Sequence, residues 1–212
     1  MGLFGKKSVS DQLIAEHPIP AQYQHLMALG VSLIERDGGP HASFMLYDPR
    51  KGKGSKYLFP MWEVRDLASL QTAVAGLVDD SRNPDVKNEK KATKAAISTL
   101  SKATSKFPSI SMDFSPARIE SVHDLGAVHL EYAAYLVRLA QSMNYAPDET
   151  LYGLLASLHA EVNRRFASWG DYLISAAKGE DHVDKPYGFL CDGYFPIAAN
   201  TASAYHRFPL AR

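Results

Sequence analysis

Two histidines occupy positions from which they could bind a metal ion together. His129 and His159 lie on the segments 121–143 and 148–178, whose apolar residues recur at helical spacing. About four residues join the segments, so we expect an antiparallel pair of helices. Counted from the turn near residue 145, the histidines lie about 16 and 14 residues away, within roughly 3 to 5 Å of the same level. Their imidazoles could therefore meet.

The carboxylates near these histidines fit a metal site poorly. The segment 120–123, Glu-Ser-Val-His, has the Glu-x-x-His spacing of di-iron bundles, but those bundles use the unit twice and add two more inward carboxylates. Glu131 and Glu161 each lie two positions from a histidine, which turns them about 200° away on a helix. Two interpretations stay open: a metal-dependent helical-bundle enzyme with ligands at His129 and His159, or buried histidines bonded to a tyrosine or a backbone carbonyl.

Lysines along one segment define a possible anion-binding face. From Asn83 to about Ser105, a predicted helix, they follow spacings of three, four and eight, while alanine and leucine cover another side. A second basic cluster lies in a predicted loop at 48–56. Side by side, the two could neutralise several phosphates of a nucleic acid, although no aromatic residue suited to base stacking accompanies them. The alternative is an ordinary solvated face. The candidate residues are Arg50, Lys51, Lys53, Lys56, Lys87, Lys90, Lys91 and Lys94.

The common motifs of nucleophilic and cofactor chemistry are missing from the sequence. It contains no Gly-x-Ser-x-Gly, no phosphate-binding glycine-rich loop before a helix and no Cys-x-x-Cys pair. Cys191 could act as a nucleophile with His182 or His206 as its base, but a lone cysteine among aromatic residues is more often a small buried residue. We therefore expect no cofactor and favour a protein that is not an enzyme.

The C-terminal segment, 179–212, is rich in aromatic residues. Disordered tails are poor in such residues, so we expect this segment to pack either on its own bundle or in the groove of a partner. Aromatic side chains are enriched in the cores of interfaces, which makes these the candidate partner-binding residues. They are Tyr187, Phe189, Tyr194, Phe195, Tyr205 and Phe208.

Several shorter elements should surround the antiparallel pair. Start and stop residues predict helices over 11–16, over 21–34 and from Asp66 to about Val78, with a polar break at 79–83. Ser115-Pro116 or Ser121-Val-His-Asp124 starts the helix that leads to residue 143. Aromatic-rich runs at 42–47 and 57–61 predict a β-hairpin around the basic loop, and 108–114 is extended or a third strand.

Length and composition favour one domain, 1–212, with a flexible arm at 1–10. The chain has 212 residues, 46% of them hydrophobic, which suffices for a core without metal or disulfide. Lys plus Arg and Asp plus Glu both number 23, which removes the bulk electrostatic argument for a nucleic-acid or membrane partner. The single cysteine favours a reducing, cytoplasmic compartment. Apolar runs are shorter than the roughly 20 residues of a membrane span.

The sequence therefore predicts an α-dominant α+β domain. A helical bundle forms around the antiparallel helix pair, with a small β-hairpin and an irregular aromatic C-terminal segment. By elimination, the expected function is that of a soluble, non-enzymatic binding or adaptor protein whose partner is another protein, such as an accessory factor of a bacterial or phage system. Nucleic-acid binding and metal-dependent catalysis are the alternatives.

Overall fold

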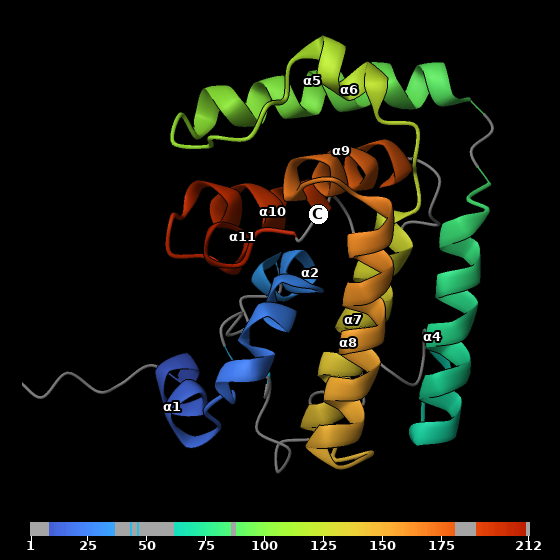
Figure 1. Ribbon diagram of the computed structural model, residues 1–212, viewed down its shortest axis with the longest axis vertical. Coiled ribbons are helices and arrows are strands. Elements are labelled where there is room, and N and C mark those ends of the chain that lie inside the picture. The colour runs from blue at the N-terminus through green and yellow to red at the C-terminus, as the bar shows by residue number, and fades with distance from the viewer. Residues whose placement is uncertain are drawn as a thin grey trace, which may run out of the picture.

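The computed structural model describes residues 9–36, 43, 46, 62–85, 88–180 and 190–210. All regular elements in these ranges are helices, labelled as in Figure 1. The predicted helical bundle is thus confirmed. The elements are α1 (Val9–Glu16), the 3-10 helix η1 (Ala21–Ala28), α2 (Val31–Arg36), α4 (Leu67–Arg82), α5 (Glu89–Lys106), α6 (Pro116–Ser121), α7 (Ala127–Ser142), α8 (Asp148–Arg165), α9 (Trp169–Gly179), α10 (Leu190–Ala199) and α11 (Ala204–Arg207).

The predicted β-structure is not seen among the described residues. The hairpin expected at 42–61 lies outside them except for Ser43 and Leu46, which belong to no strand. Segment 108–114, expected to be extended or a strand, contains a turn and a bend and joins α5 to α6. The alternating apolar residues of this segment do not reflect a strand. They alternate because Ile110 and Phe114 are buried in the core. The described part of the chain is all-helical rather than α+β.

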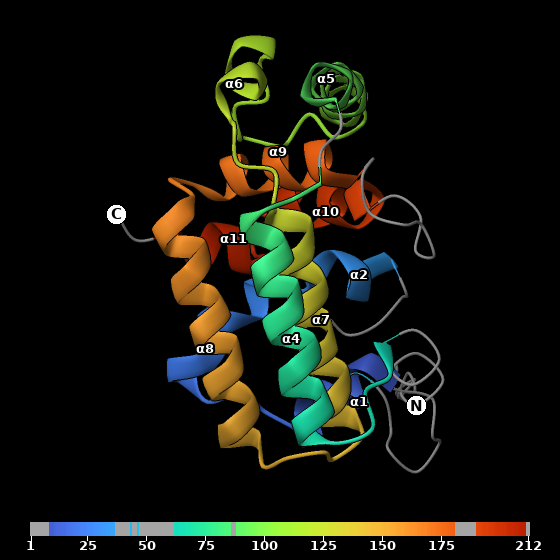
Figure 2. The same cartoon turned by 90° about the vertical axis from the view of Figure 1, so that its right-hand side faces the viewer.

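α7 forms the centre of the bundle. Its side chains are buried along the whole helix, apart from the half-buried His129. Such a helix needs cover on every face, and α2, α4, α8 and α9 supply it. Figures 1 and 2 show α4, α7 and α8 running lengthwise through the molecule. The predicted packing of the segments on either side of residue 145 is confirmed, because α7 and α8 lie against each other.

The helix predicted over 148–178 is two helices. α8 ends at Arg165, and the backbone is extended at Phe166 and Ser168. Ser168 caps the next helix, since its Oγ accepts a hydrogen bond from the backbone N of Asp171 at 3.1 Å. α9 then turns across the end of the bundle, below α5 in Figure 1. All of α9 is buried, because α5, α7 and α10 pack around it.

The helix expected over 21–34 is divided at Gly30. This residue has a φ of +68°, a left-handed conformation that favours glycine. A Cβ at Gly30 would lie 2.8 Å from the backbone N of Tyr135 on α7. The glycine therefore allows the chain to change direction at the point where it comes closest to the central helix.

Three other predicted boundaries differ from the structure. The polar break at 79–83 belongs mostly to the last turn of α4, which runs to Arg82. Asn88 rather than Asn83 caps α5, because its Oδ1 accepts a hydrogen bond from the backbone N of Lys91 at 3.0 Å. Ser115-Pro116 starts the short α6, whereas Ser121 ends it and α7 begins at Ala127.

Arg165 fixes the junction of three segments. Its Nε and Nη2 donate to the carboxylate of Asp124 at 2.8 and 2.6 Å. Its Nη1 and Nη2 donate to the Oγ and carbonyl O of Ser81, both at 2.7 Å. The guanidinium, whose side chain is only 8% exposed, thus ties the end of α8 to the end of α4 and to the segment before α7.

We expect Arg165→Met to lower the free energy of unfolding by about 2 to 4 kcal/mol, because the Asp124 carboxylate and the Ser81 carbonyl lose their donor. The neighbouring Arg164 is the matched control, since it is exposed and bonds to Glu161. Arg164→Met should cost less than about 1 kcal/mol. Urea denaturation of both variants measures the difference, and equal losses would contradict the role given to Arg165.

Candidate functional site

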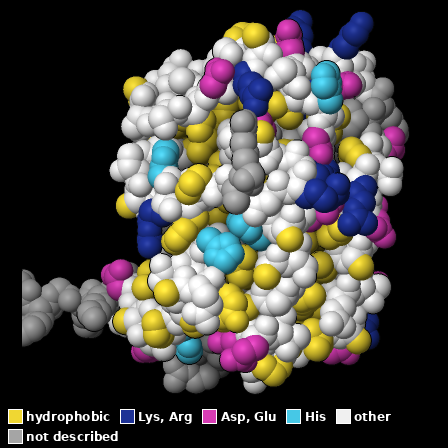
Figure 3. All heavy atoms as spheres, in the orientation of Figure 1, with side chains coloured by type: hydrophobic (Ala, Val, Ile, Leu, Met, Phe, Trp, Pro, Cys, Tyr) yellow, Lys and Arg dark blue, Asp and Glu magenta, His cyan; other side chains and the backbone are white. Residues whose placement is uncertain are grey.

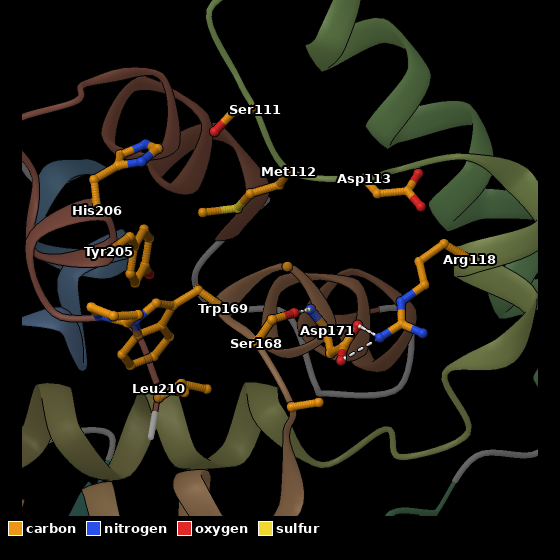
Figure 4. A pocket seen from close by; sticks show the side chains of 13 residues that line it. Ser111, Met112, Asp113, Arg118, Ser168, Trp169, Asp171, Tyr205, His206 and Leu210 are labelled. Carbon is orange, nitrogen blue, oxygen red and sulfur yellow. Dashed lines mark hydrogen bonds and ion pairs between the residues drawn. The ribbon is translucent and has the colours of Figure 1, made fainter. Parts of the chain in front are cut away.

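One face of the molecule carries histidine side chains near its middle, surrounded mainly by hydrophobic and uncharged groups (Figure 3). An open pocket has a volume of about 410 Å³. Figure 4 shows the side chains that line it. The pocket lies between the segment joining α5 to α6, the first turn of α9, and α11 with the residues after it. Its polar lining includes Ser111, Asp113, Arg118, Ser168, Asp171 and His206, and its apolar lining includes Met112, Trp169, Tyr205 and Leu210.

Helix starts place the charged residues of the pocket. Ser115 caps α6, accepting a hydrogen bond from the backbone N of Arg118 at 3.3 Å. Arg118 in turn contacts Asp171 of the first turn of α9, and its Nη2 lies 2.6 Å from both carboxylate oxygens. Figure 4 shows this pair on the opposite side of the pocket from Tyr205 and His206.

Arg118 keeps part of its hydrogen-bonding capacity. Its side chain is 40% exposed, whereas that of Asp171 is 9% exposed. A guanidinium has five N–H groups, and within the described part of the chain the side-chain hydrogen bonds of Arg118 come from Nη2 alone. Its Nε and Nη1 are therefore available to a ligand in the pocket.

Two other polar groups of the pocket are held in structural hydrogen bonds. Nε2 of His206 lies 2.7 Å from the carbonyl O of Ala198, to which it donates. Nε1 of Trp169 donates to the carbonyl O of Phe208 at 2.8 Å. Among the described lining residues, no serine hydroxyl is hydrogen-bonded to a histidine.

A buried polar cluster lies at the centre of the bundle, around Glu131 of α7. Its Oε1 accepts a hydrogen bond from the hydroxyl of Tyr172 at 2.9 Å, and its Oε2 accepts one from Ser32 at 3.0 Å. Burial raises the pKa of Glu131 to about 7, although these hydrogen bonds oppose the rise. Burial also raises the pKa of the Tyr205 hydroxyl, an effect that the charge of Glu131 increases. The cluster joins α2, α7 and α9.

The structure gives the two predicted metal ligands different neighbours. Half-buried His129 lies near Asp80 and Arg165, and burial lowers its pKa. The ring of His159 lies 4.8 Å from that of His25, between centroids. Burial, with a smaller contribution from His25, lowers the pKa of His159 to about 4. In the described ranges, no three His, Cys, Asp or Glu side chains gather in a group able to hold a metal.

The candidate partner-binding aromatics fall into three groups. Tyr187 and Phe189 lie outside the described residues. Tyr194 and Phe195 are buried in the core of this chain, so a partner cannot reach them without rearrangement, whereas Tyr205, although buried, also lines the pocket. Phe208 is half-buried, and the guanidinium carbon of Arg207 lies 5.0 Å from its ring centroid. These three buried residues of the segment 179–212 thus pack on their own bundle.

Part of the basic face can be placed. Arg50, Lys51, Lys53, Lys56 and Lys87 lie outside the described residues, as does the side chain of Cys191. Lys90, Lys91 and Lys94 are exposed on α5, whose buried side consists of Ala92, Ala96, Leu100 and Ala103. The predicted amphipathic character of this helix is therefore present, with its lysines outward.

Sequence reasoning missed Arg118, Asp171 and His25. One signal for the first pair was available, since Ser115-Pro116 and Ser168-Trp-Gly-Asp171 both have helix-start spacing. This spacing predicts that Arg118 and Asp171 each lie in the first turn of a helix, but no local sequence pattern predicts that the two turns contact each other. His25 has no signal of its own.

Fold and site together define a helical-bundle protein with an open pocket, and none of the described helices has the length and apolarity needed to cross a membrane. Comparisons with protein-family models, curated proteins and solved structures found no match.

Glu131 and His159 should give stability opposite dependences on pH. The pKa of Glu131 in the folded protein, about 7, exceeds its ordinary value of 4.5. Its contribution to the free energy of unfolding is therefore present below pH 4.5 and is lost as pH rises to 7. The pKa of His159 in the folded protein, about 4, is below its ordinary value of 6.5. Its contribution to the free energy of unfolding is therefore present above pH 6.5 and is lost as pH falls to 4.

We therefore expect Glu131→Gln to make the free energy of unfolding rise more steeply with pH than in the unsubstituted protein, between pH 4.5 and 6.5. His159→Gln should make the free energy of unfolding rise less steeply with pH over the same range. Urea denaturation at several pH values measures both, and the difference from the unsubstituted protein removes the contribution of other groups. Parallel profiles for all three proteins would show that neither side chain titrates as described.

Proposed function

We propose that the protein is a non-enzymatic binding protein, which acts by holding a segment of another protein in the pocket between Arg118 and Trp169. The observation that carries this proposal is the combination of an exposed guanidinium with unused N–H groups and a fixed aromatic wall in one open pocket. The pocket volume of about 410 Å³ accommodates a few side chains.

The walls of the pocket are suited to recognition. Tryptophan, tyrosine and arginine are the residues that contribute most often to binding energy at interfaces. Trp169 and Tyr205 are almost completely buried, and Trp169 is hydrogen-bonded to the backbone, so little side-chain entropy is lost when a ligand arrives. Ser111 and Asp113 are exposed at the pocket and offer polar groups to a peptide backbone.

Charge indicates which segments fit. Asp113 and Asp171 provide two carboxylates against the single guanidinium of Arg118, so the lining is slightly acidic when its histidine is neutral. An acidic segment would be repelled by this excess, whereas neutral polar or basic segments would not. The partner segment we expect therefore combines an apolar side chain, for the wall of Trp169 and Leu210, with a neutral or basic one.

Filling the pocket tests this proposal. We expect Ser111→Trp to remove the partner from affinity capture in the native cell, because the indole occupies the space of the bound segment. Ser98→Trp, on the exposed surface of α5 away from the pocket, is the matched control and should retain the partner. Titration of the purified partner against both variants then measures affinity. Equal capture and equal affinity in the two variants would rule the pocket out.

One observation favours a second function, nucleic-acid binding. All five lysines of α5 among the described residues are exposed, and α5 forms an outer layer of the molecule (Figure 1). At about 100° per residue they occupy one side of the helix together with serines, and no acidic residue lies between them. The lysines are Lys90, Lys91, Lys94, Lys102 and Lys106. Such a face would contact phosphates rather than bases.

The nucleic-acid function predicts retention on heparin or DNA that weakens steeply with salt, because bound phosphates release counterions. Charge reversal at Lys90, Lys91 and Lys94 should abolish retention. Charge reversal at Arg65, Arg82 and Arg164, on other elements, changes the net charge equally and should have a much smaller effect. The same loss in both triple variants would show that net charge alone is responsible, and would exclude the α5 face.

A further inference from the structure

Two histidines outside the lining of the pocket lie against each other. His25 of η1 and His159 of α8 have ring centroids 4.8 Å apart, with their planes at 77°. Imidazoles that share one metal ion at about 2.1 Å have centroids about 5 Å apart. Both residues are half-buried, so packing holds the rings. The centroid separation of His25 and His159 is close to that value.

Within the described part of the chain, three of the four ring nitrogens in this pair make no hydrogen bond. His25 makes ring contacts, with His159 and with Phe208, but no hydrogen bond to the described residues. Nε2 of His159 is buried and also unpartnered. A buried nitrogen without a partner is costly, and a metal ion between the two rings would satisfy it.

Asn163 completes the local chemistry. Its Nδ2 lies 3.1 Å from Nδ1 of His159, while its Oδ1 is buried without a partner. Amide oxygen and nitrogen exchange places when the side chain is flipped by 180°. In the flipped orientation Oδ1 accepts the Nδ1–H of His159, which leaves the lone pair on Nε2. Metal-binding histidines almost always have such an acceptor at their other nitrogen.

We propose that His25 and His159 bind one divalent late transition-metal ion, Zn²⁺ or Cu²⁺, with Asn163 orienting His159 and water in the remaining positions. Imidazole nitrogen is a preferred ligand of both ions. Because the described residues provide no third His, Cys, Asp or Glu, the site keeps open coordination positions, unlike a closed structural zinc site.

Metal titration tests the proposal directly. We expect calorimetry with Zn²⁺ to give one ion per chain, and His25→Gln and His159→Gln each to weaken binding at least 10-fold. Asn163→Ala, which removes the orienting group, should weaken binding about 10-fold. Cu²⁺ supplies a second measurement, because the ring of Trp169 lies 6.2 Å from that of His159. In a Trp62→Phe background Trp169 is the single tryptophan, and Cu²⁺ should quench its fluorescence.

His123→Gln is the matched control, since its side chain is 80% exposed and lies beside Glu89, away from the pair. It should bind Zn²⁺ as the unsubstituted protein does. Circular dichroism verifies that each variant is folded, and if His159→Gln unfolds, the half-buried His25→Gln decides the question alone. No bound Zn²⁺ at one ion per chain, or unchanged affinity in His25→Gln, would overturn the proposal. The pocket proposal is tested separately by Ser111→Trp and does not depend on this result.

Discussion

A single guanidinium in the interior joins α7 to the parts of the chain that precede it. Arg138 is completely buried, and its Nη1 donates to the carbonyl O of Leu29 at 3.1 Å while its Nη2 donates to that of Ser43 at 2.7 Å. A buried charge is tolerated only where hydrogen bonds and an opposite charge compensate its desolvation. Glu131, two turns earlier on the same helix, contributes that charge in its ionised form, which prevails above its pKa of about 7. Since these carbonyls follow η1, the position of His25 against α8 depends on this interior ion.

The central pair of helices could be predicted because their apolar periodicity is strong and long. The division between α8 and α9 could not, since Phe166 and Trp169 continue the apolar stripe of α8 across the break. Two segments share the spacing of a helix start: Ser121-Val-His-Asp124 and Ser168-Trp-Gly-Asp171. Only the second is a cap, because Arg165 engages Asp124 from across the fold. Local spacing is the same in both segments, and tertiary contacts determine which of them starts a helix. The same holds for 108–114, where a strand-like alternation reflects two side chains that enter the core.

The candidate sites were predictable to the extent that they lie on one element. The outward lysines of α5 follow directly from helical periodicity. The pairing of His159 does not, because the level of a residue along a helix can be counted from the turn, but the direction of its side chain around the axis depends on which neighbours cover which face. His129 lies near Asp80 of α4, and the ring of His159 lies against that of His25 on η1. Arg118 and Asp171 are 53 positions apart, and only the placement of α9 across the bundle end brings them together.

The last helices of the described chain close over the first ones. α10 packs on α2, where Gly193 lies so close to the carbonyl O of Ser32 that a Cβ there would be 2.0 Å away. Arg207 reaches Gln24 across 183 positions of sequence. At about 5 to 20 residues per second, a ribosome needs roughly 10 to 40 s to synthesise the chain between such partners. For that time the apolar sides of η1 and α2 lack the cover that α11 and α10 give them in the folded protein.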